Sequence, residues 1–184
     1  MTRSQHEIRE SLRDSLACLR RSGVDMQMAF GTASKIFTVF VRDAMQNTAS
    51  HNPDLDADTI KIALYGNSGT PDQTVADTLS GYNQATSQWV TANEVTATGW
   101  PAGGLSLASV TSAYASVTYT FDAADKAGGA TDTVTNAYGC LIYDNTITTF
   151  LDGICYLAFG GANSVTSGTF TVVFAAAGIF TIAV

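Results

Sequence analysis

The sequence predicts a mainly β protein: a single β-sandwich or jelly-roll-like domain of about eight antiparallel strands, preceded by an α-helical N-terminal arm. Three observations indicate this class. Short runs of β-branched and aromatic residues, separated by Gly, Asn, Asp and Ser, recur from about residue 60 onward. Charged residues make up only 14% of the chain, against roughly 25% in average soluble domains. The start of the chain instead shows helical spacing of apolar residues.

The 184 residues suffice for one domain with a substantial core, and we divide them into an arm, residues 1–32, and a β domain, residues 33–184. Charge is unevenly distributed. Residues 1–50 carry seven basic and five acidic side chains (+2), whereas residues 51–184 carry two and eleven (−9), which together give the total of −7. We expect no nucleic-acid partner for an acidic β domain, because non-specific binding of that kind depends on neutralising phosphates.

Residues 4–22 are predicted to form a helix. Ser4 and Glu7 make a capping box at its start, and Gly23 suits the position after its end. Its apolar residues repeat at spacings of four, four and three on one stripe: Ile8, Leu12, Leu16 and Leu19. So narrow a stripe requires a partner, which can be the body of the domain, a second copy of the chain or another subunit. These four residues are therefore candidates for partner binding.

A second helix is predicted within residues 32–47, where apolar residues repeat at spacings of three and four. Residues 35–41 also fit a strand, and the pattern leaves both open. The following segment, residues 47–58, is polar, contains Asn52-Pro53 and is expected to be a loop.

About eight strands are predicted in the β domain. The first, residues 60–64, alternates apolar with other residues and is expected to be half-buried. A long polar loop, residues 67–82, follows it, and such loops tend to be functional or to pack on neighbours. The other strands are expected at residues 90–95, 105–110, 114–121, 137–144, 153–161, 165–174 and 178–184.

The cysteines Cys18, Cys140 and Cys155 are odd in number and widely spaced, which argues against zinc and redox motifs. Cys140 and Cys155 lie in apolar runs, so we expect buried free thiols, with a disulfide between them as the alternative. The N-terminus lacks the apolar stretch of a signal peptide, and no run approaches the roughly 18 apolar residues of a membrane span. We expect a protein made in a cytoplasm, without membrane contact.

Few residues suggest chemistry. His6 and His51 are expected to be solvated, and the chain has neither a GxSxG elbow nor a nucleotide-binding glycine pattern. Asp54, Asp56 and Asp58 alternate as at the start of an EF-hand calcium loop, but positions six and twelve of that loop hold Thr and Tyr rather than Gly and Glu. We interpret the three aspartates as a solvated loop, and we expect no catalytic residue, metal or cofactor.

Asp122 and Asp125 flank a predicted turn. Paired carboxylates act as acid and base in glycosidases, yet only Trp89 and Trp100 suggest a sugar subsite, so we interpret the aspartates as turn and cap residues. Trp100, between Gly99 and Pro101, has two possible roles: a buried loop anchor or an exposed contact. In the second role it joins the arm stripe as a candidate for partner binding.

Several short segments together resemble a family of small virion proteins of tailed bacteriophages, described as minor tail proteins or head decoration proteins. The resemblance covers residues from about 35 to 184, and the segments occur in the family's order. They are residues 58–65 (DTIKIALY), 92–95 (ANEV), 99–104 (GWPAGG), 121–125 (FDAAD), 137–144 (AYGCLIYD), 156–161 (YLAFGG), 165–171 (VTSGTFT) and 178–180 (GIF).

The resemblance implies a non-enzymatic virion structural protein. The first hypothesis is a capsid decoration or cement subunit, present as an oligomer of identical copies, which binds the major capsid protein lattice and stabilises the head. The alternative is a minor tail, tail-tip or fibre protein that contacts host-surface glycans through exposed Trp89, Trp100 or Tyr82. Residues 1–32 precede the family's usual start, and this added arm is a candidate clamp on a neighbouring subunit.

Overall fold

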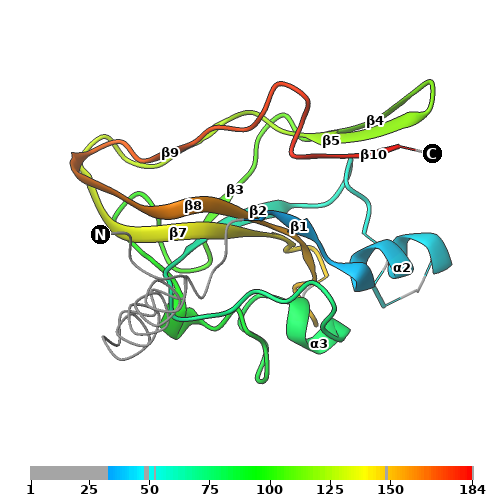
Figure 1. Ribbon diagram of the computed structural model, residues 1–184, viewed down its shortest axis with the longest axis horizontal. Helices are drawn as coiled ribbons and strands as arrows, with labels where there is room; N and C mark the ends of the chain where they lie inside the picture. Colours follow the sequence, from blue (N-terminus) through cyan, green and yellow to red (C-terminus); the bar gives the residue numbers. More distant parts are fainter. Residues whose placement is uncertain (1–32, 48–49, 52, 148, 184) are drawn as a thin grey trace, which may run out of the picture.

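The structure, a computed structural model, describes residues 33–47, 50–51, 53–147 and 149–183. Every strand pairing in it is antiparallel (Figure 1). Five strands pair in the order β1-β8-β7-β2-β3, three in the order β10-β5-β4, and β6 pairs with β9. The mainly β class with antiparallel sheets is therefore confirmed. The helix expected at residues 4–22, with its stripe, lies outside the described residues.

The elements have the following bounds. The strands are β1 (Lys35–Ile36), β2 (Ile60–Tyr65), β3 (Leu105–Ser106), β4 (Thr111–Ala115), β5 (Thr118–Asp122), β6 (Lys126–Ala127), β7 (Asp132–Asp144), β8 (Gly153–Gly168), β9 (Thr171–Val172) and β10 (Phe180–Ala183). The helices are α2 (Thr38–Gln46), α3 (Asp77–Ser80) and a 3₁₀ helix at Thr91–Asn93.

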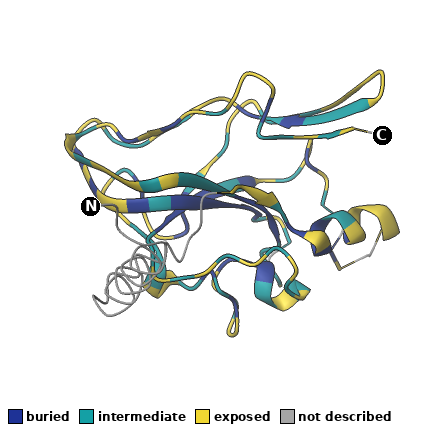
Figure 2. Cartoon of the chain, viewed as in Figure 1, coloured by how far each residue is buried: buried dark blue, intermediate teal, exposed yellow. Residues whose placement is uncertain are grey.

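The hairpin of β7 and β8 is the longest element of the fold, with strands of 13 and 16 residues. Its register shifts at four places, and three residues in it, Asn136, Gly160 and Ser167, have φ angles of 55°, 76° and 51°. Left-handed residues of this kind accompany β-bulges, which bend a strand. One end of the hairpin, residues 140–144 and 153–156, is buried, whereas residues 160–168 are mostly exposed (Figure 2).

Strand β2 lies inside the five-stranded sheet, between β7 and β3. Five of its six residues are buried, and Ala63, expected on an open face, is 0% exposed. The prediction of a half-buried strand is therefore wrong. Protein covers both faces of β2, and alternation in one strand does not reveal a second covering layer.

The ambiguous segment 32–47 contains a strand and a helix. Lys35 and Ile36 pair with β8 as β1, and α2 begins at Thr38, whose N–H and hydroxyl both donate to the Gln73 carbonyl at 3.0 and 3.1 Å. The helix ends before Asn47, which is left-handed with φ of 51°. Tertiary hydrogen bonds therefore decide where the extended chain becomes helical.

Other strand boundaries also differ from the sequence prediction. The strand expected at 114–121 is the β4–β5 hairpin, which reverses at Ser116 and Val117 without a Gly, Asn or Pro. Residues 90–95 contain the 3₁₀ helix, and the strand at 105–110 is limited to β3. Strand β8 joins the strand expected at 153–161 to the first four residues of the one expected at 165–174, because it continues through residues 160–164 in pairing with β7.

The strands form two layers in Figure 1, with β4, β5, β10 and β9 on one side of the five-stranded sheet. The core between and around them is one cluster of buried residues to which both layers contribute, including Ile62 and Ile142 from the five-stranded sheet and Phe121 from β5, each 0% exposed. The core therefore joins the layers.

Replacing Leu141 in β7 with Ala should destabilise the fold strongly. Leu141 is 0% exposed and pairs with Ala63 and Tyr156 on either side, so truncation leaves a cavity. We expect a loss of about 2–5 kcal/mol in the free energy of unfolding, measured by urea denaturation. Val173→Ala is the control, because Val173 is 70% exposed and its truncation should change stability by less than about 0.5 kcal/mol. A similar effect from both variants would contradict this packing.

Candidate binding groove

An apolar groove of about 590 Å³ lies where α2 faces β5 and β10, at the right-hand end of Figure 1. Pockets that enclose ligands in proteins have volumes of about 300–1,000 Å³. Its lining is contributed by α2, the loop at 53–55, and strands β4, β5 and β10: Phe40, Val41, Ala44, Met45, Pro53, Asp54, Leu55, Ser112, Tyr119 and Ile182. Nine of these ten side chains are uncharged, so the groove suits an apolar partner surface.

A second hollow, of about 310 Å³, lies beside the first. It is lined by Ser34, Lys35 and Ile36 on one side and by Leu157, Ile179 and Phe180 among others. The ring of Phe180 lies 6.2 Å from that of Phe40, which lines the first hollow. The two hollows therefore flank one aromatic contact between α2 and β10.

Large apolar side chains are exposed both on the groove wall and on the β4–β5 hairpin. Met45, which lines the groove at the end of α2, is 82% exposed, and Tyr114 and Val117 of the hairpin are 70% and 56% exposed. Exposed apolar side chains close together mark interaction surfaces. The groove and this hairpin are therefore the described surfaces that we consider for binding.

Trp100, a sequence candidate for partner binding, is an anchor inside the fold. Its side chain is 1% exposed, and its indole N–H donates to the Phe170 carbonyl at 3.2 Å. Asp132 holds the same turn, accepting from the Gly99 N–H at 2.7 Å and the Gly129 N–H at 2.6 Å. A ring held in this way is not available to a partner, so the structure favours the anchor role.

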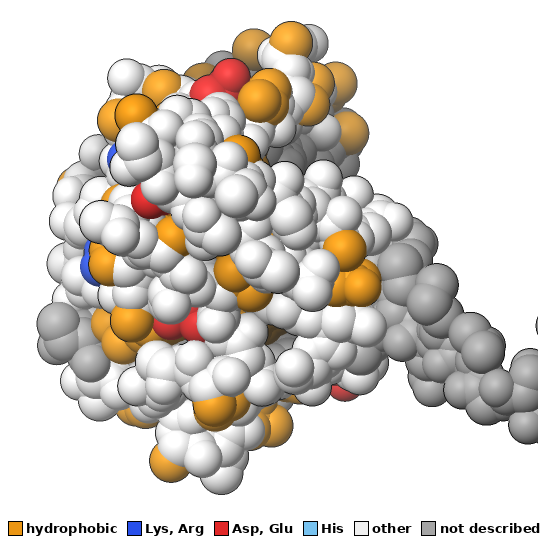
Figure 3. All heavy atoms as spheres, turned by 90° about the vertical axis from the view of Figure 1, so that its left-hand side faces the viewer, with side chains coloured by type: hydrophobic (Ala, Val, Ile, Leu, Met, Phe, Trp, Pro, Cys, Tyr) orange, Lys and Arg blue, Asp and Glu red, His pale blue; other side chains and the backbone are white. Residues whose placement is uncertain are grey.

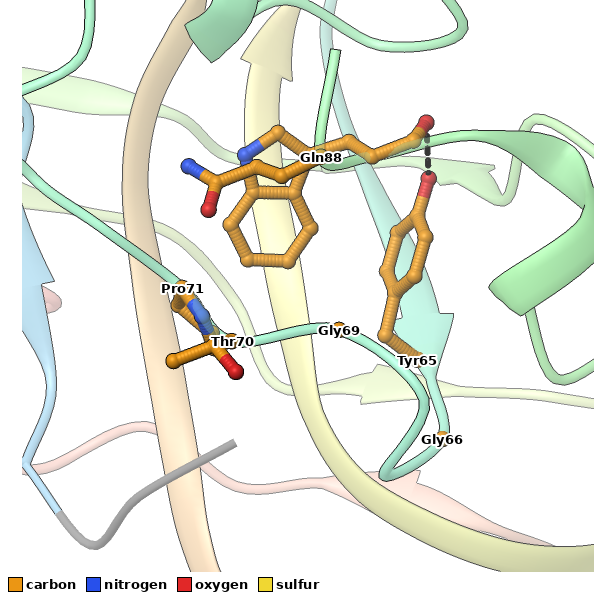
Figure 4. Close-up of a pocket in the computed structure, with 7 residues that line it drawn as sticks. Tyr65, Gly66, Gly69, Thr70, Pro71 and Gln88 are labelled. Atoms are coloured by element: carbon orange, nitrogen blue, oxygen red, sulfur yellow. Dashed lines mark hydrogen bonds between the residues drawn. The ribbon is translucent and has the colours of Figure 1, made fainter. Parts of the chain in front are cut away.

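The aromatic residues required at the surface by the glycan alternative are buried. Tyr82 and Trp89 are 7% and 2% exposed, and the ring of Tyr82 stacks on Tyr143 at 4.8 Å. In Figure 4, Tyr65 points toward the segment at Gln88 and Trp89 and donates its hydroxyl to the Trp89 carbonyl at 2.8 Å. The hollow drawn there measures about 10 Å³, enough for one water at most. None of the three named residues therefore offers a sugar a flat stacking surface.

His51 is not solvated, contrary to the sequence prediction. It is 8% exposed, its Nδ1 lies 2.7 Å from Asp152 Oδ2, and its ring stacks on Phe150 at 4.2 Å. Burial raises the pKa of Asp152, and the contact with His51 opposes that rise. A His–Asp pair is one part of a nucleophilic triad, but the hollow beside it holds only about 10 Å³. The pair therefore joins His51 to the start of β8, and the hollow beside it has no room for a substrate.

Asp144, which is buried, forms a carboxyl pair with Asp58, which is half-buried. Asp144, at the end of β7, is 0% exposed; its Oδ1 accepts from the Thr146 N–H at 2.7 Å, while Oδ2 meets no donor. Burial, reinforced by a hydrogen bond with Asp58, raises the pKa of Asp144 to about 7. A proton held between the two carboxyls supplies the missing donor, because a protonated carboxyl donates. The pair thereby links the turn at 54–58 to β7.

Glu94 fastens the turn that contains Gly103. It accepts from the Tyr82 hydroxyl and from the Gly103 N–H, both at 2.9 Å, and the Gly103 carbonyl accepts from the Tyr143 hydroxyl at 2.8 Å. Burial raises the pKa of Glu94, and these donors oppose the rise. Each Glu94 oxygen already has a donor, so we interpret the residue as structural.

Within the described ranges, no group of three or more His, Cys, Asp or Glu is placed to hold a metal ion. The same part of the chain contains no helix long and apolar enough to cross a membrane. Cys140 and Cys155 are free and buried, as expected, and burial raises the pKa of both thiols. Thiols in such surroundings are unreactive.

Comparison of the chain with protein-family models, curated proteins and solved structures finds no match. The resemblance to virion proteins therefore remains an expectation from the segments quoted above. Function is inferred from this chain's own residues and their geometry.

Sequence reasoning missed the groove and both buried carboxylate pairings. The apolar residues of α2 indicated a helix with a buried side, but nothing in the sequence placed Tyr119 and Ile182 opposite it. Asp58 and Asp144 are far apart in the chain, so the sequence does not predict that they pair. The only local sign of a buried carboxyl group is that the apolar run at residues 137–144 ends in Asp. Four of the five candidate residues, Ile8, Leu12, Leu16 and Leu19, lie outside the described residues.

The carboxyl pair predicts a pH dependence of stability. Between the ordinary carboxyl pKa of 3.8 and about 7, the folded protein retains a proton on Asp144 that the unfolded chain releases. Stability contributed by this group is therefore fully present below 3.8, falls as pH rises through the window, and is lost above about 7. Asp144→Asn, which mimics the protonated side chain, should gain on the order of 2 kcal/mol relative to wild type between pH 4 and 7.5.

Urea unfolding at several pH values measures this difference. Asp56→Asn, an exposed change of the same formal charge in the neighbouring turn, is the control for net charge. Parallel pH profiles for wild type and Asp144→Asn would contradict the shared proton.

Proposed function

We propose that this protein is a non-enzymatic structural protein of a tailed-bacteriophage virion. It binds the major capsid protein lattice as a decoration or cement subunit, in many copies, and stabilises the head. The observation that carries the proposal is the free edge of the three-stranded sheet, which combines an uncharged strand with exposed apolar side chains.

Among the described strands, β4 pairs only with β5 and lies at the edge of the sheet, whose order is β10-β5-β4. Four of its five residues are exposed, and it contains neither a charged residue nor Pro. Monomeric proteins usually protect such edges with charges, Pro or bulges, because an open edge can pair with another chain. Two large apolar side chains are exposed here: Tyr114 of β4 itself and Val117 at the tip of the hairpin. A lattice subunit supplies the partner that this edge lacks.

The character of the surface supports the same role. Charged residues are 14% of the chain, and the face in Figure 3 is made largely of uncharged polar groups and backbone, with scattered apolar side chains and few acidic or basic ones. Surfaces depleted in charge are typical of interface cores. This composition supports a protein that is covered by neighbours in its working state.

We also infer that the two layers pack face to face as a β-sandwich, the architecture that the spacing of the predicted strands indicates. Phe121 on the three-stranded sheet is 0% exposed and belongs to the same core cluster as Ile142 of the five-stranded sheet. Phe180 of β10 packs against Phe121 at 5.2 Å and Phe40 at 6.2 Å. These contacts support an apolar layer between the sheets.

The full chain should bind expanded capsid shells of its phage prepared without it. We expect saturable binding of many copies per shell, measured by co-sedimentation, and greater resistance of the shells to heat. Tyr114→Asp should weaken binding at least tenfold, about 1.4 kcal/mol, because it places a charge in the proposed contact.

Val173→Asp is the matched control, since Val173 is also 70% exposed but lies outside the β4–β5 hairpin. No binding to shells would refute the decoration role, and binding to isolated tails instead would favour the tail alternative. Equal binding by wild type and Tyr114→Asp would show that the β4 edge is not part of the contact with the shell. Imaging of intact particles locates the subunit directly.

A further inference from the structure

The apolar groove between α2 and the three-stranded sheet is open in the described part of the chain. Met45 on its wall is 82% exposed, and Val41, Tyr119 and Ile182 are only partly buried. The groove has a volume of about 590 Å³, and the adjoining hollow has a volume of about 310 Å³. A helix that lays an apolar stripe into such a groove is a common mode of recognition.

The first described residues after the N-terminal segment lie at the second hollow, beside this groove. Ser34 and Lys35 line the second hollow, and the Ser34 hydroxyl accepts from the Ala158 N–H at 3.1 Å, which fixes the chain there. Residues 1–32 therefore enter the domain beside the contact of Phe40 and Phe180.

The N-terminal segment carries a row of apolar residues that matches the apolar lining of the groove. The stripe of Ile8, Leu12, Leu16 and Leu19 spans twelve residues, about 17 Å along a helix. Four aliphatic side chains in one row match an apolar groove, since removing apolar surface from water is favourable.

Charge favours the same pairing. Residues 1–32 carry five Arg against four acids, a net +1, whereas residues 33–184 carry four basic and twelve acidic side chains, a net −8. Asp54 lies in the groove wall, and no basic residue lines the larger hollow. Arg9 and Arg13 lie off the stripe, where they can face the acidic domain.

The tether is long enough to reach and short enough to favour the chain's own groove. Fourteen residues separate Leu19 from Ser34, with a reach of up to about 50 Å when extended and a mean span of about 20 Å. A short tether gives an effective concentration in the millimolar range. The arm of another copy has no such advantage in dilute solution.

We propose that residues 4–22 form a helix whose stripe occupies the groove between α2, β5 and β10 of its own chain. The arm thereby covers the apolar groove of the free subunit. This proposal concerns the isolated protein, and it does not depend on the virion role.

Hydrogen exchange of the full chain tests the proposal. In the double variant L12D/L16D, the amides of α2 should exchange at least tenfold faster than in wild type, because the stripe no longer covers the helix. Ala17→Asp is the matched control: it adds the same charge on the opposite face of the predicted helix and should leave α2 protected. Unchanged exchange of α2 in the double variant would overturn the proposal.

A variant on the groove side separates docking from a local effect on the arm. Met45→Asp changes a side chain that is 82% exposed, so the domain should keep its fold, yet exchange in residues 4–22 should accelerate at least tenfold. Thermal unfolding of the variant checks the fold.

Light scattering distinguishes docking of the arm in the groove of its own chain from docking in the groove of a second copy. Monomers of 19.3 kDa whose α2 is protected support docking within one chain. A dimer that the double variant converts to monomer would show that the arm is exchanged between copies, and would overturn the proposal in its own-chain form.

Discussion

The backbone ladder between β7 and β8 organises the rest of the structure. β2 adds to one side of this hairpin and β1 to the other, and β3 adds to β2, so each strand of the five-stranded sheet depends on the pair. The buried half of the hairpin supplies Cys140, Leu141, Ile142, Ile154 and Cys155 to the core. Three of the four register shifts lie in the other half of the hairpin, and every other strand in the described part of the chain is much shorter.

Buried acidic groups connect loops to the ends of this ladder. Asp132, at the start of β7, holds the turns at Gly99 and Gly129, and Asp144, at its end, is paired with Asp58. Asp152, just before β8, contacts His51. A buried carboxylate without partners is costly, so each of these contacts restricts a loop to one arrangement. The domain therefore uses these acidic residues for architecture.

Two surface features are available for binding: the open β4 edge with its apolar hairpin tip, and the groove beside α2. Each suits a different kind of partner segment. An edge strand offers unpaired backbone groups to another strand, whereas a groove receives side chains from a helix. The proposed lattice contact and the proposed docking of the arm therefore use separate surfaces of the same small sheet, and the arm leaves the edge free for assembly.

The sequence alone determined the mainly β class, the buried free thiols and the apolar character of the strands, because local periodicity and composition carry these properties. It did not determine that β2 is covered on both faces, that β4 and β5 form a hairpin, or that His51 meets Asp152. Tertiary contacts decided these features. Turns without Gly or Pro, second covering layers and pairs of distant side chains depend on residues far apart in the chain, so no local pattern reports them. The groove has the same origin, since its walls come from five separate parts of the sequence that only the packed layers bring together.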